Sequence, residues 1–120
     1  MKFWCLVNVL LLSSASFADS ITCTLQSGEK TTSATLALES PQEDYAIADG
    51  LYDLSFSLTA ECATTKCTAF MTIDSRRAQS EVGSTGFDFR RSGPAREIFR
   101  EPLENAPDQR QYTLYCTYNP

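Results

Sequence analysis

Histidine is missing from this 120-residue chain, and tryptophan occurs once, at Trp4. The sequence contains no glycine-rich phosphate-binding loop and no metal-ligand spacing. It has no proline- or glycine-rich linker, no internal repeat and no low-complexity tract. These absences disfavour most enzymes, nucleotide-binding proteins and multidomain chains, and they favour one small domain without a cofactor or a bound metal.

Two kinds of catalytic site need no histidine. A serine–lysine pair would have to use Lys30 or Lys66, both in expected exposed turns where a lysine stays protonated. Paired carboxylates for glycoside hydrolysis are possible wherever a surface is acidic, so the sequence leaves them open. A carboxylate-based hydrolase is therefore the weakest functional hypothesis, and we expect a protein that is not an enzyme.

Residues 1–18, MKFWCLVNVLLLSSASFA, predict a cleaved secretory signal peptide. Lys2 supplies the positive start, an apolar run follows, and Ser16-Phe17-Ala18 has the small-x-small pattern of a cleavage site. The apolar run is too short for a transmembrane helix, which needs about 20 residues. We therefore expect residues 19–120 to form a single secreted or periplasmic domain without stable membrane insertion, the bacterial periplasm being preferred.

The stretch Leu51–Asp74 alternates apolar and polar residues and predicts a long β-hairpin. Its apolar side chains occupy even positions from Leu54 to Cys62 and odd positions from Cys67 to Ile73. With Cys62 opposite Cys67 across a four-residue loop, every apolar residue meets an apolar partner. A slip of one residue would turn one strand's apolar side chains to solvent, so the register is well determined.

This register also predicts the disulfides. Loss of Cys5 with the signal peptide leaves four cysteines, and an even number in an exported chain indicates disulfides. The hairpin register brings Cys62 and Cys67 together. By elimination Cys23 pairs with Cys116, which would tie the first expected strand to the last.

Short alternating stretches separated by turn signals continue along the chain and show no long helical period. The fold class is therefore all-β, a small disulfide-bonded β-sandwich or closed β-barrel of about six to seven antiparallel strands. Residues 77–85 fit a loop or a helical turn. Residues 95–101 fit a strand or a short helix, the strand being favoured although a hairpin with 86–91 would set Arg91 opposite Arg96. The other expected strands are Ile21–Leu25, Thr31–Glu39, Tyr45–Ala48 and Arg110–Tyr118.

An acidic segment around residues 40–50 raises the question of a calcium site. Its carboxylates are Glu39, Glu43, Asp44, Asp49 and Asp53. The EF-hand spacing is absent, and the Asp-Gly pair at 49–50 is typical of a turn. A solvated loop is therefore the favoured interpretation.

The charge distribution supplies the one binding hypothesis. Residues 19–120 carry 9 of the 10 bases and all 15 acids, a net charge of −6 that offers no general attraction to nucleic acid or an anionic membrane. Within this acidic chain one stretch is rich in arginine, whose fork binds carboxylate or phosphate in bidentate fashion. The candidate binding residues are Arg76, Arg77, Arg90, Arg91, Arg96 and Arg100.

These arginines predict contact with an anionic partner, such as an acidic polysaccharide, a lipid head group or an acidic protein surface. The alternative, to which the sequence gives more weight, is a solvated strand face whose arginines pair with neighbouring acids. We expect a non-enzymatic binding module for an unknown protein or an anionic glycan. A structural or assembly component of an envelope or extracellular structure is the second hypothesis.

Overall fold

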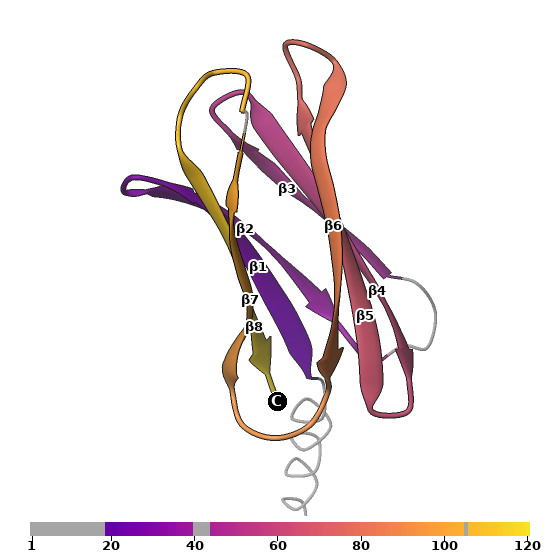
Figure 1. Ribbon diagram of the computed structural model, residues 1–120. Helices are drawn as coiled ribbons and strands as arrows, with labels where there is room; N and C mark the ends of the chain where they lie inside the picture. Colours follow the sequence, from indigo (N-terminus) through magenta and orange to yellow (C-terminus); the bar gives the residue numbers. More distant parts are fainter. Residues whose placement is uncertain (1–18, 40–43, 105) are drawn as a thin grey trace, which may run out of the picture.

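The computed structural model describes residues 19–39, 44–104 and 106–120, which form two four-stranded antiparallel sheets packed face to face (Figure 1). One sheet has the order β2-β1-β8-β7 and the other the order β3-β4-β5-β6. The strands are β1 (Ser20–Ser27), β2 (Lys30–Ala37), β3 (Asp44–Leu51), β4 (Leu54–Ala63), β5 (Lys66–Ser75), β6 (Ser80–Arg90), β7 (Arg96–Leu103) and β8 (Tyr112–Asn119). The all-β class and the sandwich are confirmed.

The closed barrel, the other expected architecture, is wrong. The chain crosses from one sheet to the other between β2 and β3 and again between β6 and β7, and neither pair shares a ladder of main-chain hydrogen bonds. At the second crossing the rings of Phe87 and Phe99 stack with centroids 4.5 Å apart. Side chains therefore cover part of this edge, and the two sheets remain open.

The register predicted for the central hairpin is confirmed. Strands β4 and β5 pair with Cys62 opposite Cys67 and Phe56 opposite Ile73. The inward side chains of these strands alternate with outward polar ones, and Phe56 and Leu58 are almost completely buried. The hydrophobic core thus lies between the sheets, where the period of two in the sequence places it.

Both predicted disulfides, Cys23–Cys116 and Cys62–Cys67, are present. Cys23 lies directly opposite Cys116 in the β1–β8 pair, so each disulfide joins neighbouring strands of one sheet. The first bridge lies in the core, where the Cys116 sulfur is 3.8 Å from the sulfur of Met71 on the facing sheet. Packing of apolar side chains, and not a disulfide, therefore holds the two sheets together.

Several sequence-based expectations are corrected. The sandwich has eight strands instead of six or seven, because the short stretch at 45–48 and the ambiguous stretch at 95–101 both form strands, β3 and β7. Strand β6 begins at Ser80, inside the expected loop at 77–85, and continues along β5. Residues 96–103 form a strand, as favoured, but β7 pairs with β8 in the other sheet. Arg91 and Arg96 are therefore not cross-strand neighbours, and the like-charge contact that counted against this strand does not arise.

The tip of the central hairpin is tighter than the expected four-residue loop. Ala63 pairs with Lys66, which leaves only Thr64 and Thr65 in the turn. Thr64 has φ 57°, and Thr65 is not among the residues with positive φ, which is the pattern of a type II′ turn. That turn normally has glycine at its first central position, whereas a β-branched residue there is strained.

We expect Thr64→Gly to raise the free energy of unfolding by about 1 kcal/mol, because glycine adopts positive φ without strain. The adjacent Cys62–Cys67 bridge limits the extra freedom that glycine would give the unfolded chain. Urea unfolding of the oxidised protein measures the change, with Thr65→Gly as the matched control. A loss of stability in both variants would show that the Thr64 backbone is not strained.

Candidate functional site

The six candidate arginines do not converge on one site. Arg76 and Arg77 follow β5 at one end of the sandwich, whereas Arg90 ends β6 and Arg91 follows it at the other end. The 11-residue strand β6 separates these two pairs. Arg96 and Arg100 belong to β7, in the other sheet.

Arg91 forms a partly buried ion pair that closes the end of the sandwich. Its guanidinium donates two hydrogen bonds to the carboxylate of Asp19, at 2.7 and 3.1 Å, and the Tyr118 hydroxyl donates a third at 2.9 Å. Burial raises the pKa of Asp19, but the bonds from Arg91 and Tyr118 together outweigh it and leave this pKa below its ordinary value. Arg91 is thus occupied inside the fold.

Three more of these arginines make contacts within the chain. Arg96 donates to the main-chain carbonyls of Ser92, Pro94 and Arg90, and its guanidinium lies 5.0 Å from the Tyr118 ring centroid. Arg100 makes a bidentate pair with Glu97. Arg76 donates to the carbonyl of Tyr52 at 3.0 Å. Of these three arginines only Arg100 pairs with a neighbouring acid, as the alternative interpretation expects, whereas Arg76 and Arg96 donate to main-chain carbonyls.

Arg90 differs from these four arginines because it faces a second cation. It lies directly opposite Lys66 in the β5–β6 pair, beside the disulfide-clamped turn, and both side chains are exposed. Neither forms an ion pair with another described residue. They border an open hollow of about 450 Å³, whose carboxylate, Asp88, accepts a hydrogen bond from Thr68 at 2.6 Å. Like charges opposed across strands are unfavourable, so an anion placed between them would be stabilised.

The opposite end carries a cluster that the sequence did not predict. The Arg110 guanidinium lies 3.7 Å from the centroid of the Tyr52 ring, and Asp108 accepts hydrogen bonds from the Tyr112 hydroxyl and from the main chain of Arg110. Burial and the bond to Asp108 raise the pKa of Tyr112, which keeps this hydroxyl protonated. The cluster ties the β3–β4 turn to the loop before β8. Tyr52 is distant in sequence from Asp108, Arg110 and Tyr112, so no local pattern could have indicated that they meet.

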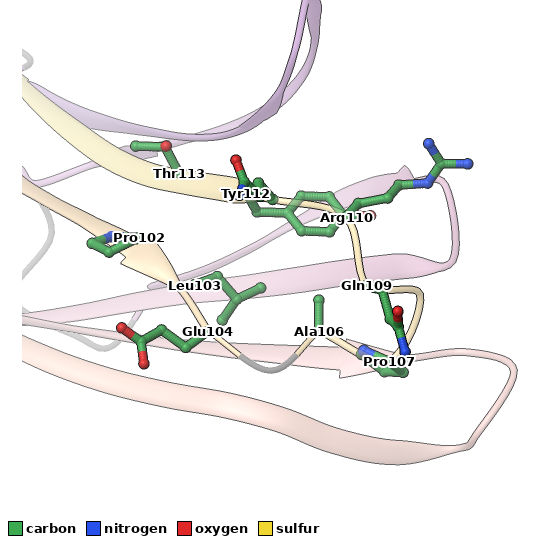
Figure 2. Close-up of a pocket in the computed structure, with 10 residues that line it drawn as sticks. Pro102, Leu103, Glu104, Ala106, Pro107, Gln109, Arg110, Tyr112 and Thr113 are labelled. Atoms are coloured by element: carbon green, nitrogen blue, oxygen red, sulfur yellow. The ribbon is translucent and has the colours of Figure 1, made fainter.

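Beside this cluster lies a hollow of about 840 Å³ (Figure 2). It lies between the end of β7 and the start of β8 and is lined by Pro102, Leu103, Glu104, Ala106, Pro107, Gln109, Arg110, Gln111, Tyr112 and Thr113. Only one of these ten is a carboxylate. A two-carboxylate hydrolytic site would need a second, so this hollow does not offer such a site from its own lining.

The outer face of the β3-β4-β5-β6 sheet exposes large apolar side chains. Tyr45, Ile47 and Phe70 are 64, 65 and 46% exposed. The register places Tyr45 and Phe70 on either side of Thr59, and Ile47 beside Ser57 in the next row. We call Tyr45, Ile47 and Phe70 the apolar face.

The other sheet presents a different outer face. Thr22 and Thr35 share a hydrogen bond at 3.0 Å, and Thr24 and Ser33 share one at 2.8 Å. None of the described residues with a large exposed hydrophobic side chain lies on its strands. The two outer faces therefore differ in chemistry, and only one offers apolar surface to a partner.

The sequence pattern of β3 points away from the arrangement that forms the apolar face. Residues 45–48 alternate large and small apolar residues, Tyr-Ala-Ile-Ala, and such a strand normally turns its large members inward. In the structure the small Ala48 is buried and Tyr45 and Ile47 face solvent. The expectation of a short strand at Tyr45–Ala48 carried no assignment of its faces, so the exposed pair was missed.

The residues described bring no three metal-ligating side chains together. Of the acidic residues considered for calcium, Glu43 lies outside the described ranges. The part of the chain that the structure covers also has no helix long and apolar enough to cross a membrane.

Fold and disulfides together define a small two-sheet β-sandwich whose cysteines are consistent with an extracellular or periplasmic protein. No family model, curated protein or solved structure matches the chain.

Proposed function

We propose that this protein is an exported, non-enzymatic interaction module that binds a partner protein through its apolar face. The observation that carries the proposal is the exposure of Tyr45, Ile47 and Phe70 on neighbouring rows of one sheet. Large apolar side chains gathered on one exposed face of a fold are typical of contact sites, and aromatic residues are enriched at their centres. The positions paired with these three residues are Ser57, Thr59 and Gly86, all small or hydroxyl residues, so a partner surface could approach closely.

The remaining chemistry supports binding over catalysis. The chain has no histidine, and its four cysteines after residue 18 are held in disulfides. The carboxylates with displaced pKa values are hydrogen-bonded to groups of the chain itself, as Asp19 is to Arg91 and Asp108 to Tyr112. A carboxylate-based hydrolase would be supported instead by turnover of a glycan that one Asp or Glu substitution abolishes.

Replacing Tyr45 and Ile47 together by serine is expected to weaken partner binding at least tenfold, about 1.4 kcal/mol, without changing the stability of the sandwich. The measurement is affinity capture from the native compartment, followed by titration of the purified partner against the variant. Tyr115→Ser, on the outer face of the other sheet, is the matched control and should bind normally. Equal binding by the double variant and the wild type would exclude the apolar face.

A second candidate, an anionic glycan, is favoured by the Lys66–Arg90 pair alone. Lys66→Ser combined with Arg90→Ser should abolish any salt-sensitive retention on an acidic polysaccharide column, because these two cations lack carboxylate partners among the described residues. Arg91 is unsuitable for this test, since its loss would leave Asp19 unpaired. Retention that survives the double substitution would exclude this site. Concentration-dependent assembly in light scattering would instead favour a structural component.

Export predicts that the mature protein begins at Asp19. Asp19 is well suited to be the first residue of the folded domain, because its carbonyl accepts a hydrogen bond from Leu38 and its carboxylate binds Arg91. N-terminal sequencing of the protein from the medium or periplasm tests the cleavage site, and Ala18→Arg should block cleavage. Recovery of the exported wild type with Met1 still present would contradict the prediction.

A further inference from the structure

Strand β6 has one open edge. It pairs with β5 on one side, and at its end the Arg91 amide donates to the carbonyl of Thr65 across that pair. In an antiparallel pair every second residue directs its main-chain N–H and C=O toward the neighbouring strand. Arg91 and the odd-numbered residues before it therefore face β5, and the main-chain groups of Ser84, Gly86 and Asp88 point away from it. Arg90 belongs to this outward set, and its carbonyl accepts from the Arg96 side chain at 2.7 Å. No described strand pairs with the outward groups of the other three residues.

A groove of about 160 Å³, lined by both polar and apolar residues, lies just inside this open edge. Its apolar walls include Ile73 from one sheet and Leu114 from the other, both buried in the core, together with Phe99 and Leu103 of β7. Gly83 contributes no side chain, and a Cβ built there would lie 3.5 Å from Leu103. The groove is therefore a gap between the sheets that an inserted side chain could fill.

The two crossings between the sheets differ in how their edge strands are closed off. At the β2–β3 side the Thr32 hydroxyl donates to the carbonyl of Asp49 at 2.6 Å and links the two edge strands. At the β6–β7 side the stacked rings of Phe87 and Phe99 cover one stretch, and the groove lies beside them. An unpaired strand edge next to a partly apolar gap has the two features that strand addition uses, main-chain hydrogen bonds and pockets for alternate side chains.

We propose that the open edge of β6 binds an extended peptide segment of a partner protein, which adds a strand to the β3-β4-β5-β6 sheet. This inference rests on the proposed interaction role and specifies how the partner is held. An apolar side chain of the peptide enters the groove above Ile73 and Leu114, and its neighbours along the peptide point to the outer face of the sheet.

Charge defines the peptide further. Glu81 and Asp88 on β6 and Glu101 on the groove wall are exposed, and the chain after residue 18 is acidic overall. Opposite charges facing each other across strands are stabilising. The peptide that fits best therefore alternates apolar residues with lysine, arginine or threonine.

A second copy of this chain fits the edge less well. In a symmetrical β6–β6 pair the side chains brought to the groove would come from Gly83, Thr85 and Phe87. Only Phe87 is large, and its ring already stacks on Phe99. The groove would then stay unfilled, so the site is assigned to a different polypeptide.

The test uses a panel of fluorescein-labelled ten-residue peptides that alternate leucine or valine with lysine or threonine, titrated against residues 19–120 of the oxidised protein. Each binder is resynthesised with N-methyl groups on either its odd or its even residues. In only one of the two forms do the N-methyl groups point toward β6. We expect that form to lose affinity at least tenfold and the other to bind normally. Amide exchange at Ser84, Gly86 and Asp88 should slow when peptide is bound.

Two protein variants provide independent checks. Ser84→Pro removes an outward amide and leaves the β5 hydrogen bonds intact, and Gly83→Leu fills the groove. Each should weaken peptide binding at least tenfold, whereas Thr31→Pro on exposed β2 should not. The inference is overturned if no peptide in the panel binds, if the two methylated forms bind equally, or if Ser84→Pro abolishes a dimer of this chain. If bound peptide slowed amide exchange only at Tyr45 and Ile47, the edge site would be overturned and the proposed function would stay intact.

Discussion

Replacement of both Cys23 and Cys116 by alanine is expected to lower the free energy of unfolding by about 4–5 kcal/mol. The bridge joins residues 93 positions apart and so restricts nearly the whole domain in its unfolded state. In the chain-entropy model a loop of this length contributes about 4.6 kcal/mol, against about 2 kcal/mol for a loop as short as that of Cys62–Cys67. A loss of this size is comparable to the total stability of many small domains.

Urea unfolding under non-reducing conditions measures this loss, with Cys62→Ala/Cys67→Ala as the matched control. The control spans only 5 positions and also removes a cross-strand bridge from a sheet. Equal losses in the two double variants would contradict the argument from loop length. Such a result would assign the stabilisation to local packing around each sulfur pair.

Arg91→Met is expected to cost about 2–3 kcal/mol, because it leaves the Asp19 carboxylate largely buried without its cation. The two side chains are only 21 and 12% exposed, and Asp19 keeps a single side-chain donor, Tyr118. Breaking a fully buried pair costs about 3–5 kcal/mol, and the residual exposure lowers that figure. A double-mutant cycle with Asp19→Asn measures the coupling, and the second change should recover part of the loss.

The same pair predicts how stability depends on pH. The pKa of Asp19 is lower in the folded protein than its ordinary value, so the unfolded chain takes up protons first as the pH falls. The stabilisation from Asp19 is therefore complete above the unfolded pKa of about 3.9 and is lost as the pH falls through the lower folded pKa. Urea unfolding from pH 2 to 7 should show a shallower acid decline for Asp19→Asn, and parallel curves for variant and wild type would contradict this.

Local alternation was sufficient for the parts of the fold in which each residue's partner follows from a register. Leu54 to Ile73 specify the central hairpin, because a shift by one residue would expose the apolar side chains of a whole strand. That register brought Cys62 opposite Cys67 and, by elimination, Cys23 to Cys116. The all-β class and both disulfides were therefore predictable from the sequence alone.

Tertiary structure decided which sheet each strand joins and which side chains remain free. Nothing local indicates that β7 pairs with β8 and not with β6, because strand exchange between sheets depends on packing of the whole core. Arg91 binds Asp19, which lies 72 positions away in the sequence. This contact makes Arg91 part of the fold and leaves it out of the arginine-rich binding surface that the sequence suggested. Tyr45 and Ile47 face outward because the alternate residues of the strand, Ala46 and Ala48, face the core. The sequence thus determined the strands and their covalent links, whereas the candidate binding surfaces exist only once the two sheets are packed.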